Sequence, residues 1–248
     1  MEIKTFETNE VMVAQQKAEL DMQITTAKAY PREVEVAIDQ SQTMIALSPE
    51  IAGGCFYTLT KGGNTITGPS VRLAEIIAAN WGNLNVGGRV IEEGQEYVTV
   101  QGVAHDMQSN VRYTTDVRRN IVTSKGARYG AAMIQTTIAA ALAIAIRNVT
   151  FKVIPRAVID QLDQYARKES IGKKEKISER IEAALLHFRS EYDISPERIC
   201  IKLGVATAKD IKAKQLEMLI GISTSLRDKS TTIEDEFPAE VMEPKAAK

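Results

Sequence analysis

The chain has 248 residues, of which 44% are hydrophobic and 25% are charged, and its formal net charge is −1. These values are typical of an ordinary globular protein with one large domain or two smaller ones. The two cysteines, Cys55 and Cys200, lie far apart in the sequence, so we expect neither a disulfide framework nor a zinc site, and a reducing compartment fits.

The pattern predicts, in chain order, helices over 9–29 and 31–47, a short helix from Ser48 to Gly54, and a hairpin over 55–67. A helix through GPSVRLAEIIAANW follows. Three short segments, 84–92, 96–105 and 110–119, are then joined by turn-prone links and predict an antiparallel meander.

A polar loop over 120–127 leads to a long alanine-rich helix over about 128–147, and VTFKVIP is expected to form a further short strand. A helix from Pro155 to about Lys168 follows, and then helices near 175–191, 195–203 and 207–227. The tail from Lys229 is polar and acidic, so we expect it to be disordered.

The predicted fold class is α+β. A helical lead-in precedes a β-β-β-α core, in which the three-stranded meander and the preceding hairpin pack on the long alanine-rich helix. A small helical module follows. The expected domains are 1–170, 171–228 and the tail 229–248.

Two segments bear on membranes. The N-terminus, MEIKTFETNEVMVAQQK, lacks the basic start and apolar run of a signal peptide. The segment AAMIQTTIAAALAIAI is about 16 residues long, which is short for a membrane span. It contains Gln135, Thr136 and Thr137, so we expect a core helix and no membrane partner.

Motifs for catalysis are not found. His105 and His187 have no partner at metal-binding spacing, and TKGGNTITGPS matches neither common phosphate-binding loop. No nucleophile, base and oxyanion stabiliser can be assembled from the sequence. We therefore expect a protein that is not an enzyme and has no catalytic residue, no metal and no cofactor.

Positive charge is concentrated in the middle of the chain. Residues 1–50 hold 4 basic and 9 acidic residues, whereas residues 51–155 hold 10 basic and 6 acidic ones. Much of the basic charge lies in VRYTTDVRRNIVTSKGARYG, over 111–130. Such asymmetry indicates an anionic partner, although a solvated charged face would give the same pattern.

Strand alternation places Arg112, Thr114, Asp116 and Arg118 on one face of the third strand and Val111, Tyr113, Thr115 and Val117 on the other. Because burying unpaired arginines is costly, these cations should reach water or a polyanion. Nucleic acid suits the donors present. The candidate DNA-binding residues are Arg72, Arg112, Arg118, Arg119, Lys125, Arg128, Tyr129, Gln135, Arg147 and Lys152.

Some of these side chains have structural alternatives. Arg72 could pair with Glu75 on the same helix face instead of binding phosphate. Tyr129, Tyr113 and Trp81 could stack on bases, but packing in the core is the preferred interpretation for the latter two.

Two stretches carry a resemblance to a known family: VRLAEIIAANWGNLNVGGRVIEEGQEYVTVQGVAHDMQSNVRYTTDVRR and KGARYGAAMIQTTIAAALAIAIRNV. Their order of helix, meander and small-residue helix resembles the annealing core of the Rad-fifty-two protein. The chain's size and C-terminal helices resemble phage single-strand annealing proteins of the RecT, Redβ and Erf type. The long helix departs from the family in carrying few basic residues.

The resemblance implies an ATP-independent protein of homologous recombination and DNA repair. It would act in the cytoplasm of a bacterial host, as a homo-oligomeric ring or helical filament that binds single-stranded DNA and the annealed duplex intermediate in a basic groove. The C-terminal module would bind a phage exonuclease or the host single-strand-binding protein. Two alternatives stay open: a nucleic-acid-binding accessory protein that does not anneal, and an oligomeric phage structural protein.

Overall fold

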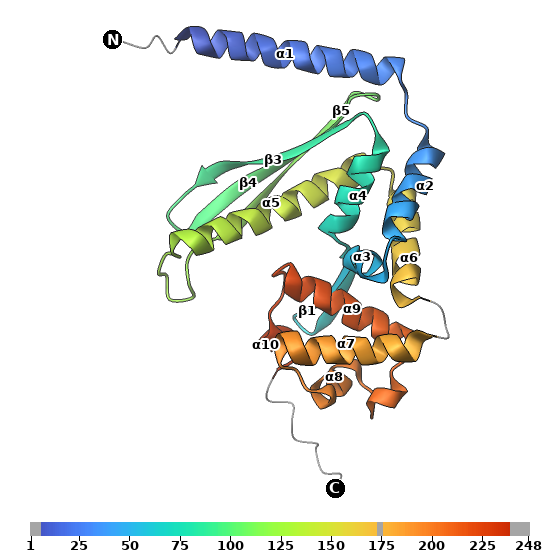
Figure 1. Ribbon diagram of the computed structural model, residues 1–248. Coiled ribbons are helices and arrows are strands. Elements are labelled where there is room, and N and C mark those ends of the chain that lie inside the picture. The colour runs from blue at the N-terminus through green and yellow to red at the C-terminus, as the bar shows by residue number, and fades with distance from the viewer. Residues whose placement is uncertain (1–5, 173–175, 239–248) are drawn as a thin grey trace. The chain divides into compact units, whose positions relative to one another are not determined.

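The computed structural model describes residues 6–172 and 176–238, with side chains from residue 11 onward. The chain forms an α+β structure (Figure 1) that divides into two compact units. Unit 1 contains the described residues up to Ile38 together with Ile77–Pro155. Unit 2 contains Asp39–Ile76 and the described residues from Arg156.

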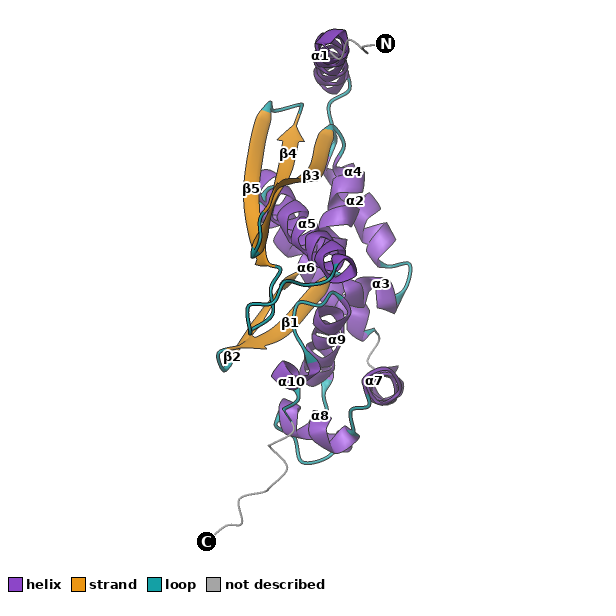
Figure 2. Cartoon of the chain, turned by 90° about the vertical axis from the view of Figure 1, so that its left-hand side faces the viewer, coloured by secondary structure: helices purple, strands orange, loops and turns teal. Residues whose placement is uncertain are grey.

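Unit 1 is built on an antiparallel sheet of three strands in the order β3, β4, β5. These strands are Leu84–Glu93, Tyr97–Asp106 and Val111–Asn120. The helix α5, Ala131–Val153, packs against one face of the sheet, and Figure 2 shows the strands side by side with α5 on one side of them. The predicted β-β-β-α core is therefore present.

The sequence allows α5 to lie close to the sheet because glycines occupy neighbouring positions under it. Gly88 and Gly102 are paired across β3 and β4. A Cβ atom on Gly102 would lie 2.6 Å from the carbonyl carbon of Ala145, so only glycine fits there without movement. Beside this contact, Val98 and Val100 are fully buried together with Ala145 and other residues of α5.

The N-terminal helix α1, Phe6–Ala29, is joined to the rest of unit 1 through its C-terminal end. Ala27 is fully buried, and the side chain of Asn83 donates hydrogen bonds to the carbonyls of Ala27 and Tyr30. Just beyond the helix, Arg32 forms a salt bridge with Asp106 at the end of β4. These contacts fix the base of α1 to one end of the sheet.

Unit 2 contains the hairpin of β1, Phe56–Lys61, and β2, Asn64–Pro69. The hairpin packs on α9, Ala213–Arg227, where Ser225 donates to the carbonyl of Thr58. The remaining helices of this unit are α3 (Pro49–Gly54), α6 (Arg156–Ile171), α7 (Ile177–Tyr192), α8 (Pro196–Leu203), the 3-10 turn Ala208–Asp210 and α10 (Ile233–Glu236). The helices α2, Val34–Ile45, and α4, Val71–Trp81, contribute residues to both units.

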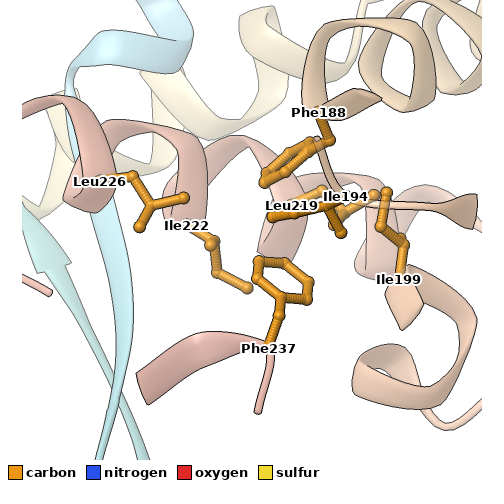
Figure 3. Packing of buried hydrophobic residues seen from close by; sticks show 7 residues of the cluster. All are labelled: Phe188, Ile194, Ile199, Leu219, Ile222, Leu226 and Phe237. Atoms are coloured by element: carbon orange, nitrogen blue, oxygen red, sulfur yellow. The ribbon is translucent and has the colours of Figure 1, made fainter. Parts of the chain in front are cut away.

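An apolar cluster holds the C-terminal helices of unit 2 together. Figure 3 shows Phe188 of α7 and Phe237, which follows α10, beside Leu219 and Ile222 of α9. The rings of Phe188 and Phe237 meet at 5.6 Å between their centroids. Because Phe237 is buried, residues 229–238 belong to the folded unit, and the prediction of a disordered tail is wrong for them. Residues 239–248 lie outside the described part.

Three further predictions need correction. The segment VTFKVIP forms no strand, because α5 continues to Val153 with Val149 and Thr150 buried. The helix expected over 207–227 is interrupted at Ile211, which is buried with an extended backbone. The hairpin packs on α9, as described above, and not on the long helix.

The expected domain boundaries also differ from the compact units. A boundary at 170 would separate α6 from α9, yet both pack in unit 2 with residues 39–76, which precede the sheet in the sequence. This arrangement joins segments far apart in the chain, and no local composition change marks it.

By length and composition α5 could also cross a membrane. One side of it is buried through Ile134, Ala141, Ala145 and Val149, while most of the other residues are half-buried. The exposed residues of the helix lie mainly in its first turns. A helix that packs on a sheet in this way passes the same test as a membrane span.

Candidate nucleic-acid interface

The face of the three-stranded sheet opposite α5 is polar. Strand pairing places Arg112 opposite His105, Asp116 opposite Gln101, and Arg118 opposite Thr99. Residues that are paired in this way point to the same side of a sheet. We call this surface the open face, and its side chains are Asn85, Arg89, Glu92, Tyr97, Thr99, Gln101, Val103, His105, Arg112, Thr114, Asp116, Arg118 and Asn120.

One end of the open face carries a stacked arginine. The guanidinium of Arg118 lies over the ring of Tyr97, 4.1 Å from its centroid, and 4.0 Å from the carboxylate of Glu92. The hydroxyl of Tyr97 donates to Glu92 at 3.1 Å. Arg118 nevertheless keeps 61% of its side chain exposed. An exposed pair at 4.0 Å is weak, so the guanidinium can exchange Glu92 for another anion.

The centre of the open face is held by Gln101. Its amide oxygen accepts a hydrogen bond from Arg89 at 3.0 Å, and its amide nitrogen donates to Asp116 at 3.1 Å. These two hydrogen bonds link side chains on all three strands of the sheet. They place one cation and one anion on either side of Gln101 at the middle of the sheet.

The other end of the open face carries Arg112, which is exposed. His105 lies opposite it and contacts the side-chain oxygen of Asn110 at 3.2 Å. Within the described residues, Arg112 makes no hydrogen bond or ion pair. The face therefore carries three arginines against Asp116 and Glu92, which is an excess of one positive charge without His105.

The loop after β5 is fixed at its C-terminal end. Arg128 donates to the carbonyls of Gly94 at 2.5 Å and Gln95 at 2.8 Å, and it forms a salt bridge with Glu93 at 2.8 Å. These bonds attach the loop to the turn between β3 and β4. Lys125 at the loop tip is exposed. Of the two loop cations predicted to bind DNA, Lys125 is therefore exposed, whereas Arg128 is bound to groups of its own chain.

Other predicted residues lie away from the open face. Arg119 lies in β5 opposite Val98 of β4, which is on the α5 face, so Arg119 also faces α5. It was expected to begin the loop. Tyr129 packs against the core cluster of unit 1. Gln135 is exposed on α5, Arg147 bonds to its neighbour Asn148, and Lys152 is exposed near the end of α5.

Arg72 belongs to unit 2 and forms a salt bridge with Glu75 at 2.9 Å. This pairing is the alternative to phosphate binding that the sequence left open. The hydrogen bond from Arg72 to Glu75 raises the pKa of this guanidinium. Trp81 is buried under Arg32, with 4.9 Å from the guanidinium carbon to the ring centroid, so it acts in packing. Tyr113 has the predicted core-side parity, but 42% of it is exposed.

Sequence reasoning missed the contributions of β3 and β4 to the open face, namely Arg89, Tyr97, Gln101 and His105. These residues lie at the positions of their strands that face the open side, as Arg112 and Arg118 do on β5. The signal was therefore present, but it becomes visible only when the pairing register of the three strands is known.

Within residues 6–172 and 176–238, no group of three or more His, Cys, Asp or Glu side chains could hold a metal ion. Burial raises the pKa of the Cys55 thiol to about 12, which makes it a poor nucleophile.

Comparison with known proteins gave no relative. The chain matches no family model, no curated protein and no solved structure.

Proposed function

We propose that the protein binds single-stranded DNA through the phosphate backbone on the open face and promotes annealing of complementary strands without ATP. The observation that carries this proposal is the placement of Arg89, Arg112 and Arg118 together on one uncovered sheet face. A three-stranded sheet with ten residues in each strand offers a surface that can follow several nucleotides.

The proposed mechanism depends on which atoms the protein contacts. Arginine and hydroxyl donors bind phosphate oxygens of any sequence and leave the base edges free. An annealing protein needs both properties, because a second strand must pair with the bound one. The ring of Tyr97 lies under Arg118, so at this end of the face the stacked guanidinium, and not the ring, is presented to a ligand.

The small excess of positive charge implies weak binding by one copy. Repetition of the face in a homo-oligomer would raise the avidity for a long strand without new contacts. In this proposal the protein is not an enzyme and needs no cofactor. Its partners are single-stranded DNA, the annealed duplex and further copies of the chain in the bacterial cytoplasm.

The test is a double variant, Arg112→Ala with Arg118→Ala. We expect affinity for oligonucleotides of different sequences to fall equally, and the slope of log affinity against log salt to decrease by about 0.7 for each phosphate that is no longer neutralised. Fluorescence anisotropy measures both, and annealing of two complementary oligonucleotides is followed with and without ATP. The matched control is Arg156→Ala with Arg189→Ala, which removes the same charge from exposed positions of unit 2.

Three results would contradict the proposal. Equal weakening by both double variants would indicate general charge attraction and not a site. Binding without faster annealing would favour an accessory nucleic-acid-binding protein. No salt-sensitive binding at all would favour a structural protein.

A further inference from the structure

The strand β3 contains a bulge that changes which of its side chains reach the open face. Val90 is paired with Val100 of β4. The next pair along the two strands joins Glu92 to Thr99, so Ile91 is an extra residue on β3. In a regular strand Ile91 would lie opposite Thr99 on the open face, and Glu92 would point to the α5 side. The bulge therefore exchanges an apolar side chain for a carboxylate on the open face.

Two neutral hydroxyl groups hold the carboxylate of Glu92 in place. The hydroxyl of Tyr97 donates to one of its oxygens at 3.1 Å, and the hydroxyl of Thr99 donates to the other at 3.4 Å. The guanidinium of Arg118 lies farther away, at 4.0 Å, which is beyond hydrogen-bond distance. The position of Glu92 therefore does not depend on Arg118, and the carboxylate would stay on the open face if this guanidinium bound another anion.

The neighbouring pair of Glu93 and Arg128 is a much tighter contact. Arg128 forms a salt bridge with Glu93 at 2.8 Å and also donates to two backbone carbonyls, and its side chain is 35% exposed. The guanidinium of Arg118 makes no hydrogen bond to any residue that the structure describes, and its side chain is 61% exposed. Arg118 is therefore attracted by a carboxylate of its own chain without being bound by it, and all of its donors remain available to a second anion.

We propose that Glu92 is a built-in competitor of the DNA phosphate for Arg118, and that it sets the affinity of the open face for single-stranded DNA. This inference rests on the proposed function, because it concerns the same site. A phosphate that binds Arg118 must come close to a fixed negative charge, so part of the attraction is cancelled. The contact stays weak and exchangeable, which suits a protein whose bound strand must move and pair with a second one.

The experiment compares two variants that each remove one negative charge from the open face, Glu92→Gln and Asp116→Asn. Asp116 is the matched control, because it forms no ion pair within the described part of the chain. The amide of Glu92→Gln can still accept from the hydroxyl of Tyr97 and donate to that of Thr99, so the geometry is kept. Fluorescence anisotropy measures the affinity for single-stranded oligonucleotides at several salt concentrations.

We expect Glu92→Gln to bind single-stranded DNA at least about twofold more tightly than Asp116→Asn at low salt, because groups in contact couple more strongly than separated ones. A double-mutant cycle with Arg118→Ala then distinguishes competition from general repulsion. In the Arg118→Ala background the gain from Glu92→Gln should be at least about twofold smaller than in the wild-type background, whereas the gain from Asp116→Asn should be the same in both.

The inference is overturned if Glu92→Gln binds no more tightly than Asp116→Asn, or if its gain is the same with and without Arg118. Weaker binding by Glu92→Gln would also overturn it, because Glu92 would then position the guanidinium for phosphate.

Failure of the proposed function is distinguishable from failure of the inference alone. If neither the wild-type chain nor Glu92→Gln binds single-stranded DNA in a salt-sensitive way, the proposed function is wrong, and the inference is overturned with it. If DNA binding depends on Arg118 but is unchanged by Glu92→Gln, only the inference is overturned.

Discussion

The two faces of the three-stranded sheet carry different kinds of residues, which alternate along each strand. On the α5 face, Gly102 lets the helix backbone approach and Gly88 makes room for the side chain of Leu142. Val98 and Val100 are buried against the same helix. On the open face the alternate positions hold arginine, glutamine and threonine, and no helix packs on them among the described residues. A period of two residues along each strand thus separates a surface made for packing from one that leaves hydrogen-bond donors exposed.

The same contrast applies to arginine itself. Arg32 joins Asp106 at the end of the α5 face, where their side chains are 7% and 10% exposed. Arg118 and Glu92 on the open face are 61% and 48% exposed and 4.0 Å apart. The buried arginine–carboxylate pair is therefore expected to stabilise the fold, whereas the exposed pair is expected to contribute little to stability. Substitutions should distinguish these two cases.

The largest effect is expected from Arg32→Ala. This change leaves the buried Asp106 without its cation and also removes the hydrogen bond that the Nε of Arg32 donates to Gln108. Breaking a buried pair costs about 3–5 kcal/mol of folding free energy. The matched change Arg118→Ala on the open face should alter the free energy of unfolding by at most about 1 kcal/mol. Urea denaturation of both variants checks the comparison, and equal losses would contradict it.

The pH dependence of stability tests the same interaction between Arg32 and Asp106. Burial alone would raise the pKa of Asp106, but the hydrogen bonds from Arg32 and the Ser109 amide hold it below its usual value. A lowered carboxyl pKa contributes stability that is present above about pH 4 and is lost as pH falls through the lowered pKa. The difference in unfolding free energy between wild type and Arg32→Ala should therefore shrink on acidification. A difference that is constant down to the acid transition would contradict the role of Asp106.

An intermediate effect is expected from Gly102→Ala. The new methyl group would meet the backbone of Ala145 at 2.5 Å, so α5 or the sheet must move, at a cost of about 1–3 kcal/mol. Gly87 on the open face is the matched control, because a Cβ there has no atom within 4 Å. Gly87→Ala should be neutral or stabilising by about 0.4–1 kcal/mol. Thermal denaturation measures both. If Gly87→Ala were the more damaging change, the assignment of the two faces would be wrong.

The sequence predicted the sheet well and the division into units poorly. The three strands have alternating patterns and turn residues between them, so local physics is enough to place them. The long helix was predicted too short, because the β-branched residues of VTFKV suggested a strand, whereas Val149 is buried as part of the helix. The packing of residues 39–76 with the C-terminal helices depends on contacts between distant segments, which no window of sequence contains.

The candidate site was predicted in part for a similar reason. The alternation of Arg112 and Arg118 can be read from β5 alone. The opposite orientation of Arg119 depends on β5 extending to Asn120, and the engagement of Arg128 depends on a turn more than thirty residues earlier. Isolated cations in a loop give no indication of which partner within the chain will bind them.

The smallest effect is expected from Asp116→Asn, which tests whether the open face acts as a unit. An asparagine oxygen can still accept the hydrogen bond that Gln101 donates at 3.1 Å, so the geometry is kept while one negative charge is removed. Interactions of exposed charges are worth about 0.2–1 kcal/mol, so single-stranded DNA should bind about 1.4- to fivefold more tightly at low salt. The gain should disappear at high salt as screening shortens the Debye length. Glu182→Gln, an exposed position of α7 in unit 2, removes the same charge away from the face and should change little. Weaker binding by Asp116→Asn would mean that this carboxylate itself contacts the nucleic acid, and equal gains from both variants would mean that only net charge matters.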